Sequence, residues 1–253
     1  KKTSTAQQPF KPVVFGHGYG GSSADIYAFA GFFAQQGLAS ISIDYPQHQI
    51  NLPPTQLGLV SSILGGACLA PLAEEALKGR AYDRDGDGQY DSGWWYWTPH
   101  LFRTRDNVRQ SIVDLMQISR ILGTFDGVTK GDDYSGDNVP DLAGDFDGDG
   151  TPDLRGDVAS TMGVSMGGIT TMISGAVDHR IDAVAPVVGG GGLTDIASRS
   201  FGVSQSVMQK TMSPLLVSYP VVAGAPPSLG YTDAPITPPS PYDDALYTTR
   251  DVT

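Results

Sequence analysis

The chain has 253 residues, of which 27 are acidic and 16 are basic, and its formal net charge at pH 7 is −11. This charge argues against binding to nucleic acid, because phosphate backbones are recognised by clustered lysine and arginine. The single cysteine excludes an internal disulfide, no apolar run is long enough to span a bilayer, and the length suits one domain with a large core.

The first predicted element is a short buried strand at residues 12–15, which leads directly into a glycine-rich loop. Residues 16–21 of this loop read Gly-His-Gly-Tyr-Gly-Gly. A backbone N–H of such a loop is a typical donor of an oxyanion hole, and we expect that donor to be Tyr19. We expect His17 to shape the loop by hydrogen bonding rather than to act as a catalytic base.

The loop is followed by a predicted helix and a second strand. The helix covers residues 23–36, with Ser22 or Ser23 as its N-cap and Gly37 at its C-terminal end. Residues 38–46 alternate between apolar and polar types and are rich in β-branched side chains, which predicts the strand.

A longer helix is predicted over residues 103–122, and Gly123 ends it. Its side chains expected to face the core recur at the spacing of one helix face. They are Val108, Ile112, Leu115, Ser119 and Leu122.

The sequence Gly163-Val164-Ser165-Met166-Gly167 follows a strand-like run at 158–162 and precedes a helix-like run at 169–176. A G-x-S-x-G motif at such a junction is typical of a nucleophile elbow. There the serine takes a strained backbone conformation, and only glycine fits two residues to either side. We therefore predict Ser165 as a nucleophile, with the backbone N–H of Met166 as the second oxyanion donor beside Tyr19.

The last predicted strand covers residues 181–188 and runs into four consecutive glycines. The alternation of strands and helices, with apolar strands expected to be buried on both faces, indicates a mostly parallel sheet between helices. The predicted fold class is therefore α/β.

Three acidic loops share a nine-residue spacing of oxygen-bearing side chains, with glycine or asparagine at the sixth position. Oxygen ligands at positions one, three and five, a backbone carbonyl at seven and an aspartate at nine are typical of Ca²⁺ loops. Two loops have the full pattern and predict two Ca²⁺ sites, while the loop with Asn138 is a looser third copy. The expected ligands are Asp83, Asp85, Asp87, Gln89 and Asp91; Asp145, Asp147, Asp149, Thr151 and Asp153; and, in the looser copy, Asp133, Ser135, Asp137, Val139 and Asp141.

All three loops fall in two predicted inserts, at about residues 47–100 and 124–157. Long inserts are hard to order by packing alone, and Ca²⁺ bound only by the folded state would stabilise them. The alternative is that the loops are acidic solvated turns without metal. Loops of weak to moderate affinity would suffice in extracellular fluid, so a structural calcium role favours a secreted protein.

Four of these motifs occur together in one known family. They are the His17-Gly18 loop, the Asp44-Tyr45-Pro46 strand end, the helix start at residues 105–110 and the Ser165 elbow. With them the chain resembles, over about residues 10–195, the α/β-hydrolase superfamily, and more narrowly its bacterial secreted lipases and esterases. The resemblance implies a Ser-His-Asp triad and an acyl-enzyme formed on Ser165.

The chain departs from this family in its histidines. The family order is Ser, acid, His, but only His179 follows Ser165, in a turn expected at the opposite end of the sheet. We therefore expect the 253 residues to hold one hydrolase domain that lacks the C-terminal part of the fold. A longer precursor or a second chain would then supply the base. Asp195 is the best candidate acid by position, with Asp233 behind it; the alternative is that both are ordinary loop carboxylates.

Two other classes of function stay open. One is a calcium-stabilised binding or adhesion module on an inactive hydrolase scaffold, and the other is a serine peptidase or acyltransferase. Residues 46–73 carry no charge, and the apolar segment at 57–64 is either a mobile lid for an ester or lipid substrate or a packing element. The aromatic run at 94–97 either lines a cleft or forms a small core of the insert.

Overall fold

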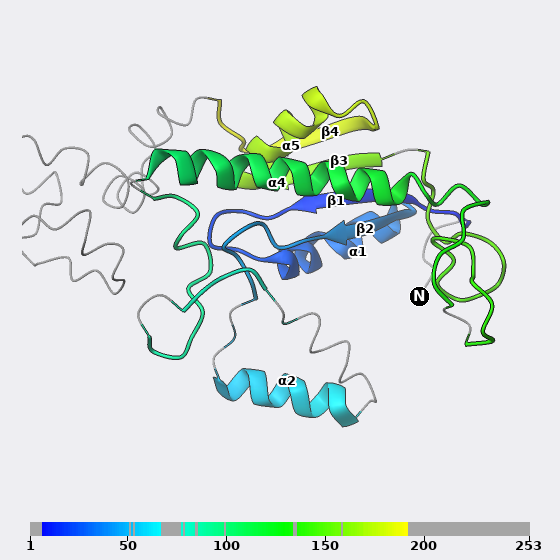
Figure 1. Cartoon of the computed structure of the whole chain (residues 1–253), viewed down its shortest axis with the longest axis horizontal. Coiled ribbons are helices and arrows are strands. Elements are labelled where there is room, and N and C mark those ends of the chain that lie inside the picture. Colours follow the sequence, from blue (N-terminus) through cyan, green and yellow to red (C-terminus); the bar gives the residue numbers. More distant parts are fainter. Residues whose placement is uncertain are drawn as a thin grey trace, which may run out of the picture. The chain divides into compact units, whose positions relative to one another are not determined.

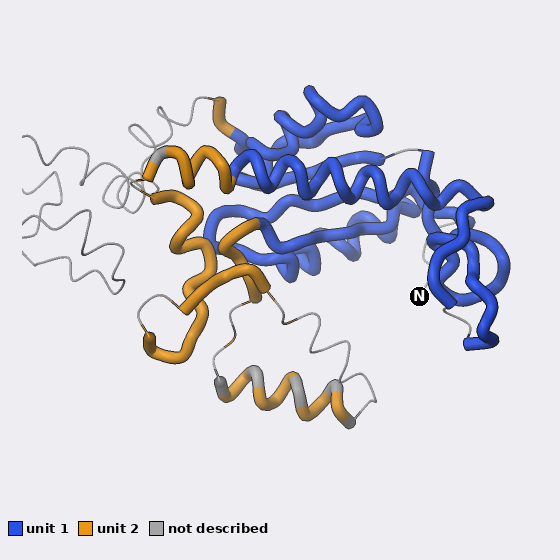
Figure 2. The backbone as a smooth tube through the Cα atoms, viewed as in Figure 1, with its two compact units in different colours: residues 1–45, 108–189 blue, residues 46–107, 190–253 orange. Residues whose placement is uncertain are grey.

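The computed structural model describes residues 7–50, 52, 54–66, 77, 79–83, 86–98, 100–133, 136–157 and 159–191. The chain divides into two compact units, which Figure 2 shows in different colours. The first unit comprises Lys1–Tyr45 and Val108–Gly189, and the second comprises Pro46–Asn107 and Gly190–Thr253. The first predicted insert, at about 47–100, lies inside the second unit.

The first unit is built on a four-stranded sheet of β1 (Lys11–Gly16), β2 (Leu38–Ser42), β3 (Ala159–Val164) and β4 (Ile181–Val187). The strand order is β2-β1-β3-β4, and every neighbouring pair is parallel (Figure 1). The predicted α/β class with a parallel sheet and flanking helices is therefore confirmed.

Three helical segments follow or precede the strands of this sheet. A 3-10 turn η1 (Ser23–Ile26) and helix α1 (Tyr27–Gln35) follow β1, while α5 (Met166–Val177) joins β3 to β4. Val13 and Phe15 of β1 pack with Ile26 of η1 and Phe33 of α1 in the core. Val14 of β1 is buried as well, so the central strand is covered on both faces.

Helix α4 (Leu101–Leu122) precedes β3 in the chain. Its predicted core face is confirmed, since four of the five expected side chains are buried and Ile112 is half-buried. Gly123 follows the last helical residue, as expected from its low helix propensity.

Strand β4 differs from the prediction of strands buried on both faces. Only Ile181 is buried, and the next six residues are exposed. The physical reason is position: β4 is an edge strand of the described sheet, so its outer side lacks a neighbour among the described residues. An apolar run of this length does not distinguish an edge strand from a central one.

The start of the first predicted helix is confirmed in part. Ser22 lies at the N-cap of η1, as expected, but its side chain makes no capping hydrogen bond, and the α-helix itself begins only at Tyr27. Instead the backbone N–H of Ser23 donates to Oδ1 of Asp44 at 2.6 Å. A carboxylate from the loop after β2 thus satisfies one of the free backbone donors at the start of this helical segment.

The second unit contains helix α2 (Pro54–Gly66), so the apolar segment at 57–64 is helical. Within the aromatic run, Tyr96 is fully buried and its ring lies 5.1 Å from that of His48, whereas Trp94 is exposed. Nδ2 of Asn107 donates to the carbonyl oxygens of Trp95 and Tyr96 at 3.0 and 2.9 Å. None of the described helices combines the length and apolarity that crossing a membrane would need.

Candidate active site and metal-binding loops

The strand order places a switch point between β1 and β3. From β1 the chain first adds β2 on one side and then β3 on the other, so the loops after β1 and β3 leave the sheet side by side. In open parallel sheets, ligands bind outside the carboxyl ends of the strands at such a point. A Cβ built on Gly18 would lie 3.7 Å from the Cβ of Ser165, so the two loops meet there.

Ser165 occupies the junction of β3 and α5 in a strained conformation. Its φ is 56° and its ψ is −113°, which is uncommon for a residue with a side chain. Its N–H donates to the carbonyl of Val187 at 2.9 Å, and its carbonyl accepts from the N–H of Ile169 at 3.2 Å. The side chain is half-buried. The strain that the motif predicts is therefore present at this serine.

The glycines on both sides of Ser165 are required by close backbone approach. A Cβ on Gly163 would overlap the carbonyl group of Gly167, and a Cβ on Gly167 would overlap the carbonyl of Gly16. The turn therefore presses the N-terminus of α5 against the end of β1, which no larger residue would allow.

His17 is fully buried, and both of its ring nitrogens engage backbone groups. Nε2 lies 3.0 Å from the N–H of Tyr45 and accepts its proton. Nδ1 must then carry the ring proton, which it donates to the carbonyl of Gly18 at 2.8 Å. Burial lowers the pKa of His17, so the ring is neutral at pH 7. A base would need one of these nitrogens, so His17 does not fill that role.

A second buried contact joins Tyr45 to the elbow helix. The Tyr45 hydroxyl lies 2.7 Å from Oγ1 of Thr170, which in turn donates to the carbonyl of Gly167 at 3.0 Å. The Thr170 hydroxyl donates its only proton to the carbonyl of Gly167, so it must accept in its hydrogen bond with Tyr45, and the Tyr45 hydroxyl is the donor. A Cβ at Gly16 would overlap this Tyr45 hydroxyl. Burial raises the pKa of Tyr45, so the phenol stays protonated.

The remaining predicted residues of this site fall as follows. Tyr19 is half-buried in the loop after β1, and Met166 is buried in the first turn of α5. His179 is exposed in the turn between α5 and β4. This turn lies at the amino ends of the strands, whereas Ser165 lies at their carboxyl ends. The candidate acids Asp195 and Asp233 lie outside the described residues.

The other two histidines belong to the second unit and have structural partners. Nδ1 of the fully buried His48 lies 2.8 Å from the carbonyl of Pro46. Nδ1 of the exposed His100 accepts the backbone N–H of Arg103 at 3.2 Å, one turn into α4.

The described residues of the three acidic loops share one pattern of backbone hydrogen bonds. In each loop the first aspartate accepts the backbone N–H groups of the fourth and sixth positions, which winds the chain around its carboxylate. These pairs are Asp83 with Gly86 (2.7 Å) and Gly88 (2.9 Å), Asp133 with Gly136 (2.7 Å) and Asn138 (2.8 Å), and Asp145 with Gly148 (2.9 Å) and Gly150 (2.8 Å).

The looser copy adopts the same turn as the two full copies. Asn138 has a φ of 67°, close to the 86° of Gly88 and Gly150 at the same position. Asparagine tolerates this left-handed region better than other residues with a side chain. The fifth-position carboxylate accepts the N–H of the seventh residue in all three loops: Asp87 from Gln89 (2.7 Å), Asp137 from Val139 (2.8 Å) and Asp149 from Thr151 (2.8 Å).

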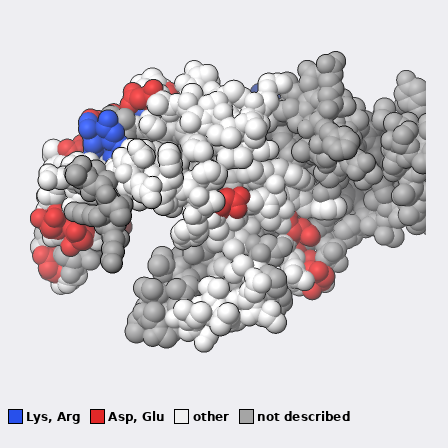
Figure 3. All heavy atoms as spheres, turned by 180° about the vertical axis from the view of Figure 1, so that it is seen from behind, with Lys and Arg blue, Asp and Glu red and all other residues white. Residues whose placement is uncertain are grey.

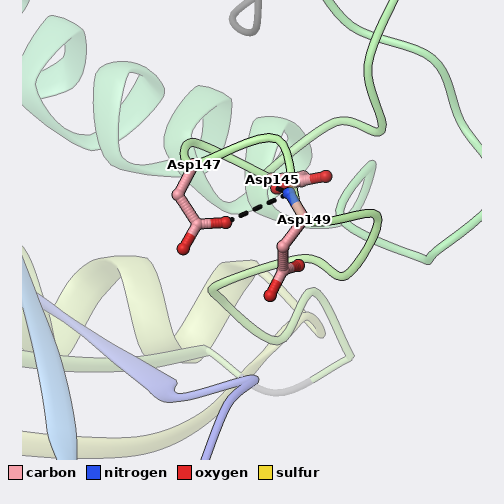
Figure 4. Close-up of side chains that lie close together, drawn as sticks. All are labelled: Asp145, Asp147 and Asp149. Atoms are coloured by element: carbon pink, nitrogen blue, oxygen red, sulfur yellow. Dashed lines mark hydrogen bonds between the residues drawn. The ribbon is translucent and has the colours of Figure 1, made fainter.

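One loop brings its carboxylates together in an arrangement that could hold a metal ion. Asp145, Asp147 and Asp149 each offer an oxygen, and these oxygens lie within 4.8 Å of one another (Figure 4). Asp145 is buried, whereas the other two are exposed. In the other loops the third-position residues, Asp85 and Ser135, lie outside the described part of the chain. Figure 3 shows acidic side chains in several small groups on this face of the molecule.

The loop at 145–153 is attached to the residue that precedes β1. The carbonyl of Asp153 accepts the N–H of Phe10 at 2.7 Å, and the N–H of Arg155 donates to the carbonyl of Phe10 at 2.8 Å. The Asp153 carboxylate accepts the N–H of Phe146 at 2.9 Å. The last expected ligand of this loop therefore also forms part of the entry to the sheet. Nothing local in the sequence marks this pairing.

The described part of the chain thus belongs to the α/β class, with a strained serine at the switch point of a parallel sheet. Comparison of the chain with models of protein families, with curated proteins and with solved structures found no match.

Proposed function

We propose that the protein is a secreted serine hydrolase of carboxylic esters, a lipase or esterase of the α/β-hydrolase type. The observation that carries the proposal is the φ of 56° at Ser165, at the β3–α5 junction beside the loop after β1. Such strain costs about 1–3 kcal/mol and clusters at active sites, where the surrounding structure maintains it. Ser165 is half-buried, so the surrounding structure does not enclose the residue completely.

In the proposed reaction, Oγ of Ser165 attacks the ester carbonyl carbon and gives up its proton to a base. The carbonyl oxygen becomes an oxyanion, which the backbone N–H groups of Tyr19 and Met166 hold. The carbon–oxygen bond to the alcohol then breaks, and the alcohol leaves with the proton. Water attacks the acyl-enzyme in the same way and releases the acid. We propose that the base is a histidine of a segment or chain outside this sequence, oriented by Asp195.

The resident metal is proposed to be Ca²⁺, held by the loops at 83–91 and 145–153 and by the looser loop at 133–141. Every expected ligand is an oxygen, and the shared winding of the three loops supports a common ion. Its role would be to stabilise the inserts rather than to take part in ester cleavage.

The substrate class is proposed from the second unit. Helix α2 carries no charged side chain, and Leu59 and Ile63, four residues apart on the helix, are each 61% exposed. An exposed apolar helix of this kind suits the acyl chain of a lipid better than a small polar ester.

A fluorophosphonate probe tests the proposal, because it labels a serine only where the hydroxyl is activated. We expect labelling of Ser165 in the intact protein that contains this chain, and none in a Ser165→Ala variant. Hydrolysis of a nitrophenyl ester without hydrolysis of the matching anilide would separate an esterase from a serine peptidase. Transfer of the acyl group to an added alcohol in preference to water would indicate an acyltransferase.

One observation favours a second function, a calcium-stabilised binding or adhesion module on an inactive scaffold. Of the two histidines in the first unit, His17 has both ring nitrogens hydrogen-bonded to backbone groups, and His179 lies at the amino ends of the strands, away from Ser165. A protein whose Ser165 stays unlabelled while its calcium sites fill would support this alternative.

A further inference from the structure

From these contacts we infer that His17, Tyr45 and Thr170 form one positioning unit, which orients the peptide between Gly18 and Tyr19 against the serine elbow. The inference rests on the proposed hydrolase function, since that peptide carries the N–H assigned to the oxyanion. All three side chains are at most 1% exposed, and they come from the loop after β1, the loop after β2 and helix α5.

The first part of this unit holds the oxyanion donor through the opposite end of its own peptide. The carbonyl of Gly18 and the N–H of Tyr19 belong to one planar trans peptide, so they point in opposite directions. The Gly18 carbonyl accepts two protons, from Nδ1 of His17 at 2.8 Å and from the N–H of Gly21 at 3.1 Å. Fixing the carbonyl in this way fixes the direction of the N–H.

The second part ties His17 to the elbow. Nε2 of His17 accepts the N–H of Tyr45, and the hydroxyl of the same tyrosine donates to Thr170 at 2.7 Å. Thr170 in turn donates to the carbonyl of Gly167, the last residue of the G-x-S-x-G motif. Tyr45 is thus held at its backbone by His17 of the loop after β1 and at its hydroxyl by Thr170 of helix α5. Its rigid side chain therefore links the His17 loop to the helix that follows the serine elbow.

This arrangement has a consequence that packing alone would not have. An oxyanion exists only in the tetrahedral state, so a misdirected donor slows the chemical step and leaves binding of the ester unchanged. Loosening the unit should therefore lower kcat with little effect on KM. A purely structural role would lower the melting temperature and leave the kcat of the folded fraction intact.

Two substitutions at His17 separate its two bonds. The side-chain amide of glutamine reaches the place of Nε2, so His17→Gln keeps the acceptor for Tyr45 and loses the donor to Gly18. The amide of asparagine reaches the place of Nδ1, so His17→Asn keeps the donor to Gly18.

Two further substitutions, Tyr45→Phe and Thr170→Val, break the link to the elbow without changing side-chain shape. Thr171→Val is the matched control, because Thr171 is equally buried on the same helix and its hydroxyl has no partner in the described structure.

The variants are made in the intact protein and assayed with a nitrophenyl ester and a boronic acid that forms a tetrahedral adduct. We expect His17→Gln to lower kcat and boronate affinity about 100-fold, with KM within about twofold. His17→Asn should recover about tenfold of this loss, Tyr45→Phe and Thr170→Val should each lower kcat about tenfold, and Thr171→Val should leave it unchanged.

Equal losses in His17→Gln and His17→Asn, or a loss confined to KM, would overturn the inference while leaving an active wild type and the proposed function in place. Should the His17 variants not fold, Tyr45→Phe decides: a kcat no lower than that of Thr171→Val contradicts the positioning role. A wild-type protein that neither hydrolyses esters nor reacts at Ser165 overturns the proposed function, and this inference with it.

Discussion

Gly167 packs directly on the backbone of Gly16, so that a methyl group on Gly167 would overlap the Gly16 carbonyl. The two residues are far apart in the chain, but at this point the end of strand β1 and the helix that follows β3 are in direct backbone contact. Strand order places the His17 loop and the Ser165 elbow side by side at the carboxyl ends of β1 and β3, and this contact allows them to approach closely. The geometry of the candidate site therefore depends on a position where only glycine fits.

The first prediction concerns this contact. Gly167→Ala should destabilise the fold by about 1–3 kcal/mol, because the methyl group must push the backbone of β1 away from α5. Gly31→Ala is the control, since Gly31 lies in helix α1 with no atom within 4 Å of an added Cβ. Alanine there should leave stability unchanged or raise it by up to about 1 kcal/mol. Urea unfolding of both variants measures the difference, and equal stabilities would contradict the contact.

The second prediction concerns the strain at Ser165. Ser165→Gly should stabilise the protein by about 1 kcal/mol relative to Ser165→Ala, because glycine adopts a positive φ at no steric cost and alanine does not. The gain will be partly offset by the greater freedom of glycine in the unfolded chain. Both variants lack the hydroxyl, so both should lose esterase activity. Thermal unfolding that ranks the alanine variant as equal or more stable would argue against a strained serine.

The features that could be predicted from the sequence are local ones. The elbow and the acidic loops are motifs of a few residues, in which the spacing of glycines and of oxygen-bearing side chains is visible in the sequence itself. Strand spacing and helix periodicity are local as well, and they correctly predicted α4 and the parallel sheet.

Contacts between distant segments could not be predicted in this way. Tyr45 and Thr170 are 125 residues apart, and a hydroxyl pair has no periodicity that would reveal it. The pairing of Phe10 with Leu154 is also non-local. The exposure of β4 depends on its place at the sheet edge, which an apolar run does not encode.

The third prediction concerns pH. Burial lowers the pKa of His17 below its ordinary value of 6.5, so in acid the unfolded chain takes up a proton that the folded protein excludes. The stability due to the neutral ring is complete above pH 6.5 and is lost as the pH falls toward the lowered folded pKa. The free energy of unfolding should fall in this window by up to about 1.4 kcal/mol per pH unit from this group.

His17→Gln is the comparison for this prediction, because it keeps the acceptor for Tyr45 but cannot titrate. The difference in unfolding free energy between wild type and variant, measured from pH 7.5 down to 4.5, should shrink as the pH falls. Carboxylates distant from His17 titrate equally in both proteins and cancel in the difference. A constant difference across this range would show that His17 is not held neutral.

The fourth prediction concerns metal. EDTA should lower the melting temperature by several degrees, and Ca²⁺ should restore it while equal Mg²⁺ does not, because the loops offer many flexible oxygen ligands and Mg²⁺ requires a compact octahedron. Asp145→Asn should reduce the Ca²⁺-dependent change in melting temperature most. The buried Asp145 carboxylate accepts the N–H groups of Gly148 and Gly150, and it lies in the cluster with the carboxylates of Asp147 and Asp149. Asp182→Asn, at an exposed aspartate on β4, is the control.

Ca²⁺ should also affect amide hydrogen exchange. Because the loop at 145–153 is hydrogen-bonded to Phe10, Ca²⁺ should slow exchange at the start of β1. Exchange that is unchanged by Ca²⁺ at Phe10, with an unchanged melt, would mean that the loop stands without metal.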